Sequence, residues 1–185
     1  MYWLIAGLVI FFGVHIFSNF RTAREKTVQR LGEKRYKAGY SLLAVAGFIL
    51  IVIGVGKSEP VLLWVPAEWG RYAAVWFMPF AFISLAAALI PSNFRRFTAH
   101  PMLWSVTLWA LLHLLANGNL TGLILFGAFG LYAVHAMSSQ NARGARPSQF
   151  KRPLINDIGV VVAGLILYWL FLHFHARLFG VPVVY

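Results

Sequence analysis

The feature that most constrains this chain is a succession of apolar runs, each near the length of a membrane crossing, separated by short polar segments. A helix crosses the hydrocarbon core with about 20 largely apolar residues, and in lipid its backbone hydrogen bonds must be satisfied internally. We therefore predict an all-α, polytopic membrane helix bundle that forms a single integral membrane domain over residues 1–185. The spans, about six, are predicted over residues 2–18, 39–56, 69–90, 101–116, 120–137 and 157–174.

The charge pattern predicts the orientation of these spans. The net charge of +11 would fit nucleic-acid binding in a soluble protein, but 60% of the residues are hydrophobic, against about 45–50% in a soluble domain. Three connecting segments, residues 21–37, 91–100 and 138–155, are predicted to be cytoplasmic, and they contain thirteen of the sixteen Lys and Arg residues. The other three are Lys57, Arg71 and Arg177. Positive charge on the inner loops predicts both termini outside, with the lipid bilayer rather than nucleic acid as the partner. The first run has no basic n-region or cleavage site, which predicts a retained helix.

Three segments carry further local predictions, and the first leaves two alternatives open. Residues 21–37 carry seven basic side chains, and this pattern fits either a short amphipathic helix on anionic headgroups or a plain solvated loop. Pro79 within the third predicted span predicts a kink. In the fifth span, Gly127 and Gly130 lie near one face and favour close helix packing.

The segment from His100 to Asn119 places polar groups in an apolar run. Pro101 fits the first position of a helix, and the Asn-Gly-Asn sequence from Asn117 fits its end. His113 is therefore predicted to lie within the membrane, and helical spacing puts Trp109, His113 and Asn117 on one face. A buried imidazole needs a partner. It would either hydrogen-bond to a neighbouring helix or ligate a metal or haem iron.

The other histidines differ in predicted depth. His15, His100 and His135 fall toward the cytoplasmic side, whereas His173 and His175 fall near the outer surface and are predicted to be interfacial rather than ligands. The chain has no cysteine, which excludes thiolate ligation and covalent c-type haem attachment. Histidine is therefore the favoured ligand type for any bound metal.

Three stretches resemble the NnrU family of bacterial membrane proteins. They are Gly13–Ser18 with Arg21, His100–Trp104, and Leu112–Gly118. The family is related to zeta-carotene isomerase, a membrane enzyme that binds haem b through histidines. The resemblance implies a multi-pass protein of the bacterial inner membrane that binds haem b and has a role in nitrogen-oxide respiration. It also implies His15 and His113 as axial ligands, with His100 as the histidine of the His-Pro motif. Helical spacing adds Trp109 and Asn117 beside the site, and His100 and His135 are alternative ligands.

One departure from the isomerase bears on activity. The isomerase has a cysteine three residues before the second ligand, and this chain has Ala110 there. An exchange of ligands to thiolate is therefore impossible, which argues against carotenoid cis-trans isomerisation.

Three functions remain open. They are a haem-b protein of nitrogen-oxide respiration or membrane redox chemistry that would bind a small gas, a haem-dependent isomerase of a hydrophobic polyene, and a cofactor-free scaffold or small transporter. The sequence does not identify catalytic residues, and it does not determine the oligomeric state.

Overall fold

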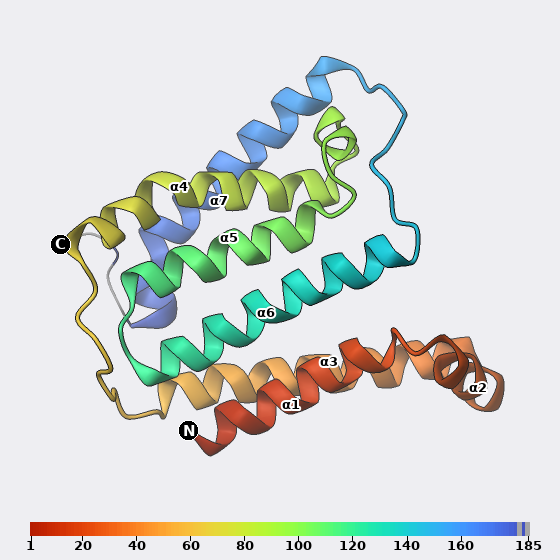
Figure 1. Cartoon of the computed structure of the whole chain (residues 1–185), viewed down its shortest axis with the longest axis horizontal. Helices are drawn as coiled ribbons and strands as arrows, with labels where there is room; N and C mark the ends of the chain where they lie inside the picture. Colours follow the sequence, from red (N-terminus) through yellow and green to blue (C-terminus); the bar gives the residue numbers. More distant parts are fainter. Residues whose placement is uncertain (181–182, 184–185) are drawn as a thin grey trace. The chain divides into compact units, whose positions relative to one another are not determined.

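The structure, a computed structural model, describes residues 1–180 and residue 183 (Figure 1). Throughout this part of the chain the regular elements are helices, which confirms the all-α class. Two compact units divide the chain, Met1–Val61 and Leu62–Tyr185.

The first unit contains α1 (Tyr2–Phe17), α2 (Arg21–Leu31) and α3 (Glu33–Gly56). Helices α1 and α3 pack antiparallel through glycines on both sides of the contact. A Cβ on Gly7 would lie 2.6 Å from the Ile51 nitrogen, and one on Gly47 would lie 2.8 Å from the Phe11 nitrogen. A Cβ on Gly54 would collide with the backbone of Leu4. The two helices therefore touch backbone to backbone, as small residues permit in membranes.

The basic segment of this unit contains the short helix α2, so the solvated-loop alternative is wrong for residues 21–31. The axis turns by 92° between α1 and α2, across the break after Phe17. Gly32 separates α2 from α3 with a φ of 78°. Glycine adopts this left-handed conformation without a Cβ clash, which explains the sharp break there.

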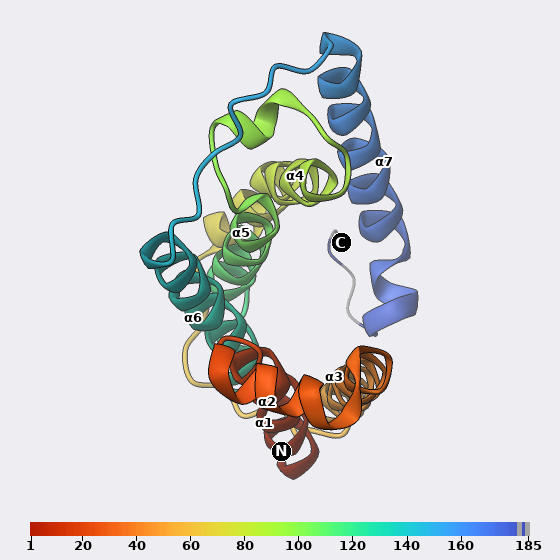
Figure 2. The same cartoon turned by 90° about the vertical axis from the view of Figure 1, so that its right-hand side faces the viewer.

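The second unit contains α4 (Glu68–Leu89), the 3₁₀ helix η1 (Asn93–Arg96), α5 (Pro101–Ala116), α6 (Leu120–Ala142) and α7 (Leu154–Phe179). Helix α5 packs between α4 and α6, and α7 packs on α4 (Figures 1 and 2). The core contacts involve small and aliphatic side chains. One cluster contains Met78, Ala81 and Leu112, and another contains Ala86, Ala87 and Val160.

Helix lengths refine the prediction of about six spans. In the described chain, α3, α4, α6 and α7 are each long and apolar enough to cross a membrane. Helix α1 passes the same test only together with α2, and α5 has only 16 residues. At a rise of about 1.5 Å per residue, α5 is shorter than the hydrocarbon core of about 30 Å. The structure thus shows a multi-pass arrangement, while the count of six and the side of the termini stay predictions.

Helix ends differ from several predicted span ends. Helix α3 begins at Glu33 instead of residue 39, α6 continues to Ala142 instead of 137, and α7 covers Leu154–Phe179 instead of 157–174. The predicted limits mark the edges of apolar runs, and the helices continue past these edges because charged residues are compatible with helix in water or headgroups. Pro79 lies within α4, which is one helix from Glu68 to Leu89.

Backbone contacts connect the loop before α4 with the turn between α5 and α6. The nitrogens of Leu63 and Trp64 both donate to the Gly118 oxygen, at 2.8 and 3.1 Å. Leu62 forms an isolated antiparallel bridge with Asn119. The sequence pattern predicts that both segments lie on the outer side, and these contacts agree with a shared side.

At the opposite end of the unit, Asn93 connects η1 with the start of α7. Its nitrogen and its Nδ2 each donate to a carboxylate oxygen of Asp157 at 2.7 Å. Its Nδ2 also donates to the Arg152 oxygen at 2.8 Å, and its Oδ1 accepts from the Arg152 nitrogen at 2.9 Å. One side chain therefore fixes the entry of the chain into α7.

Candidate functional site around His113

His113 lies in the last turn of α5, which begins at Pro101 and ends before Asn117 as the sequence predicts. Its Nδ1 is 2.8 Å from the Trp109 oxygen. A carbonyl oxygen only accepts, so Nδ1 carries the proton and Nε2 carries the lone pair. The side-chain nitrogen of Asn117 donates to the His113 oxygen at 2.8 Å. The predicted face of Trp109, His113 and Asn117 is therefore present as a connected set.

Aromatic rings surround the imidazole. The Trp109 ring centroid lies 5.1 Å from that of His113. Phe126 of α6 stacks on His113 with centroids 4.5 Å apart and an angle of 25° between the rings. Trp109 also meets Phe129 edge to face at 5.7 Å. The half-buried imidazole thus has aromatic neighbours on both α5 and α6.

His175 of α7 also lies beside His113, and the sequence did not place it there. The two ring centroids are 6.4 Å apart, with the rings 22° from parallel. The sequence gives one indication of this position, the seven-residue spacing between Tyr168 and His175. In the structure, Tyr168 donates from its hydroxyl to the Val75 oxygen of α4 at 2.8 Å. Residues seven apart share a helix face, so Tyr168 and His175 point the same way. His173, on another face, is exposed and stacks on Trp169 at 5.3 Å.

His15 occupies an equivalent position near the end of α1 in the first unit. Its Nδ1 is 2.7 Å from the Phe11 oxygen, so the same tautomer is fixed as at His113. Its ring lies 4.2 Å from that of Phe11 and 5.5 Å from that of Tyr40. The Ser18 hydroxyl donates to the His15 oxygen at 2.7 Å.

The two alternative histidines lie in different surroundings. His100 is buried at the start of α5, and its Nε2 lies 2.8 Å from the Asn141 oxygen Oδ1 near the end of α6. Its backbone nitrogen donates to Thr98 Oγ1 at 3.0 Å. His135 is exposed on α6. The geometry of His100 is that of a side chain that joins two helices.

Ala110 lies one turn before His113 and is 1% exposed. A Cβ added to Gly130 of α6 would lie 3.3 Å from the Ala110 Cβ, so these two small residues set the approach of α5 to α6. Gly127, the other glycine predicted to favour close packing, has open space around its Cβ position.

Histidines that bind metals usually donate their second ring nitrogen to a carbonyl or carboxylate, which fixes the tautomer and orientation of the ring. His113 and His15 both satisfy this requirement, so their donor chemistry fits an axial haem ligand. Over the described residues no group of three or more His, Asp or Glu side chains could hold a metal ion.

The fold and these contacts define a class: a multi-pass α-helical membrane protein with a histidine enclosed by aromatic rings in its helix bundle. Residues 3–183 match the NnrU protein family. The chain belongs to this family. No curated protein and no solved structure matches it.

Proposed function

We propose that this protein binds haem b in the bacterial inner membrane, with His113 and His15 as axial ligands. One observation carries the proposal: the Nδ1 of each imidazole is bound to the carbonyl one turn earlier, so each Nε2 presents its lone pair. When bound, haem b would supply a one-electron redox centre able to take up a small gas ligand. Following the family, we propose a role in nitrogen-oxide respiration or related membrane redox chemistry.

The residues around His113 have separate parts in this proposal. The Trp109 oxygen holds the tautomer and the direction of the ring, and Asn117 holds the last turn of α5 through the His113 oxygen. Phe126 limits ring rotation by stacking. Together these contacts would orient the ligand in advance and exclude water from it.

The test is an absorption spectrum of the full chain, purified in detergent after expression with a haem precursor. We expect a Soret band and, after reduction, the sharp α and β bands of a bis-histidine haem. His113→Ala should remove the band, and His135→Ala, at an exposed position, should leave it unchanged. A colourless wild-type protein, or full haem content in His113→Ala, would contradict the proposal.

The second ligand needs its own comparison, because His175 provides another imidazole beside His113. His15→Ala and His175→Ala should be measured in parallel. We expect the low-spin spectrum to become high-spin in His15→Ala and to stay low-spin in His175→Ala. The opposite result would assign the second position to His175 while leaving haem binding intact.

Isomerase activity is less favoured than redox chemistry at this site. Ala110 provides no thiolate, and its tight packing against Gly130 leaves little room for a larger side chain. Conversion of a cis-carotenoid by reduced, haem-loaded protein would nevertheless establish the isomerase alternative, so this assay belongs beside the spectra.

A further inference from the structure

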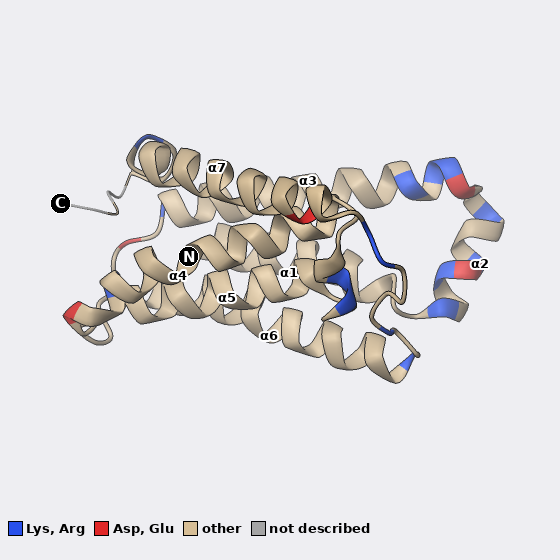
Figure 3. Ribbon diagram, turned by 90° about the horizontal axis from the view of Figure 1, so that it is seen from above, with Lys and Arg blue, Asp and Glu red and all other residues tan. Residues whose placement is uncertain are grey.

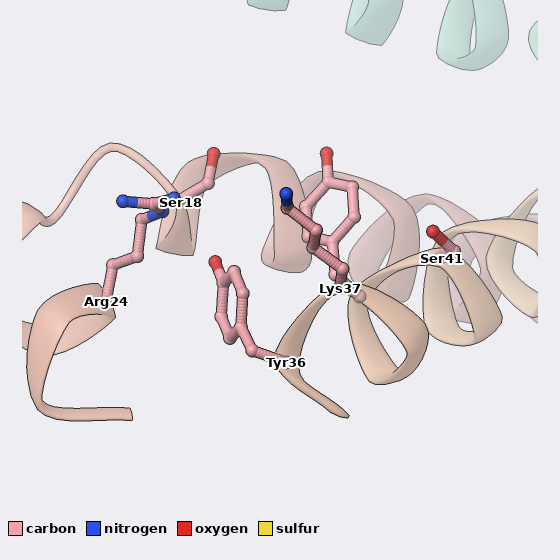
Figure 4. Close-up of a pocket in the computed structure, with 6 residues that line it drawn as sticks. Ser18, Arg24, Tyr36, Lys37 and Ser41 are labelled. Atoms are coloured by element: carbon pink, nitrogen blue, oxygen red, sulfur yellow. The ribbon is translucent and has the colours of Figure 1, made fainter. Parts of the chain in front are cut away.

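The right-angled turn after α1 creates a cleft within the first unit, between α2 and the start of α3. The cleft has a volume of about 310 Å³ and is lined by Ser18, Arg24, Tyr36, Lys37, Tyr40 and Ser41 (Figure 4). Since the axis turns by 92° after α1, a membrane-crossing α1 would place α2 along the membrane surface. The cleft would then open at the level of the lipid headgroups.

The lining of the cleft is cationic and rich in hydroxyl groups. Arg24 and Lys37 supply two positive charges, and the other four residues supply hydroxyls. The guanidinium carbon of Arg24 lies 5.6 Å from the Tyr36 ring centroid, a cation–π contact that directs Arg24 toward the cleft. Figure 4 shows Arg24 and Tyr36 approaching Ser18 from different elements.

Charge complementarity favours an anion. None of the lining residues is acidic. Glu33 does pair with Lys37 at 2.7 Å, but both side chains are more than 60% exposed, and exposed ion pairs of this kind are weak. An anion with several oxygens would engage Lys37 and Arg24 together. Figure 3 shows that basic residues gather on α2 and at the start of α3, so the surroundings add to the positive potential.

The apolar surface next to the cleft favours a lipid over a soluble anion. Ser41 lines the cleft, and Val45, Phe48 and Val52 follow it at helical spacing along α3. These three side chains are 56%, 53% and 53% exposed. A headgroup in the cleft would therefore direct its acyl chains along an exposed apolar stripe.

We propose that this cleft binds the phosphate of an anionic phospholipid, such as phosphatidylglycerol, at the inner surface of the membrane. Arg24 and Lys37 would contact the phosphate oxygens, and the hydroxyls of Tyr36, Tyr40 and Ser41 would complete the site. The proposal concerns the first unit alone and is independent of haem binding.

The test is native mass spectrometry of the full chain in detergent, titrated with dioctanoyl phosphatidylglycerol, dioctanoyl phosphatidylcholine or inorganic phosphate. The wild type should retain phosphatidylglycerol in preference to phosphatidylcholine. The double variant Arg24→Gln, Lys37→Gln should bind it at least about tenfold more weakly, because charge-assisted hydrogen bonds to phosphate are lost. The matched control is Lys26→Gln, Lys34→Gln, which removes the same charge at exposed positions outside the cleft lining.

Three outcomes would overturn the proposal. Equal losses in both double variants would show that only overall charge matters. Equal retention of the two lipids by the wild type would exclude headgroup selection. Binding of inorganic phosphate as tight as that of the lipid would assign the cleft to a soluble anion. Circular dichroism shows whether each variant keeps its fold. The single variants Lys37→Gln, in the cleft lining, and Lys34→Gln, outside it, repeat the comparison with milder changes at exposed residues.

Discussion

At the scale of single residues, the histidines differ in the hydrogen-bond partner that holds each ring. His113 and His15 are bound through Nδ1 to carbonyls of their own helices, whereas His100 is bound through Nε2 to the side chain of Asn141 on another helix. A ring held by its own helix can face a cofactor. A ring held between helices contributes to the packing of those helices, and His100 is of this second kind.

Replacing His100 therefore tests stability rather than cofactor binding. His100→Ala leaves Asn141 without its partner, and we expect the free energy of unfolding to fall by about 1–3 kcal/mol. Denaturant titration in detergent measures this change, and haem content per protein should stay at the wild-type level. The double variant with Asn141→Leu should recover part of the loss. Normal stability with loss of the Soret band in His100→Ala would instead identify it as a ligand.

At the scale of elements, the contact of α1 with α3 depends on glycines whose missing side chains let two backbones meet. The Gly7 Cβ position lies 2.8 Å from the Gly47 oxygen, too close for any side chain without movement of a helix. Overpacked contacts cost about 1–3 kcal/mol. These positions are therefore sensitive to a single methyl group.

Gly7→Ala and Gly13→Ala form a matched pair on α1. No atom lies within 4 Å of the Cβ position of Gly13. We expect Gly7→Ala to lower the free energy of unfolding by about 1–3 kcal/mol, and Gly13→Ala to leave it unchanged or raise it by up to about 1 kcal/mol, since alanine favours helix. Thermal unfolding in detergent compares them. Equal melting temperatures would show that α1 and α3 do not pack this way.

The contact between Asn93 and Asp157 is the second element-scale feature, since it fixes α7 to η1. Asn93→Ala removes hydrogen bonds to a carboxylate and to the backbone of Arg152, and should cost about 1–3 kcal/mol. Hydrogen exchange should increase at the start of α7 and remain unchanged in α2. Gln29→Ala, at an exposed position on α2, is the control. Unchanged exchange at residues 153–158 in Asn93→Ala would contradict this role.

At the scale of the whole molecule, basic residues determine the expected orientation. The positive-inside rule places residues 21–37 and 143–152 on the cytoplasmic side and residues 57–67 on the other. The contacts of Leu63 and Trp64 with Gly118 agree with a common side for residues 62–64 and the turn at 117–119.

Single-cysteine labelling tests this orientation without background, because the chain has no cysteine of its own. Glu59→Cys and Gln149→Cys introduce thiols in two connecting segments. In intact cells, a membrane-impermeant maleimide should label Glu59→Cys only, and both variants should be labelled after lysis. Labelling of both variants in intact cells would contradict the three crossings that are predicted between residues 59 and 149.

The sequence predicts features that depend on local rules. Pro101 and Asn117 mark the ends of α5 to the residue, and helical spacing places Trp109 beside His113. Contacts between distant helices are harder to predict. The approach of His175 to His113 depends on how α7 packs on α4, and the partner of His100 is 41 residues away. Hydropathy also underestimates the lengths of α3, α6 and α7, because it detects apolar surface rather than helix.

The turn that follows the His113 helix has an evolutionary consequence. Residues 63 and 64 meet Gly118 through backbone atoms, and a Cβ on Gly118 would collide with the Trp64 oxygen. The side chains of residues 63 and 64 take no part in these two hydrogen bonds, so any residue except proline at these two positions keeps the backbone donor. Gly118 has no such freedom, because any side chain there would collide with the Trp64 oxygen. Of these three positions, we therefore expect Gly118 to tolerate the fewest substitutions.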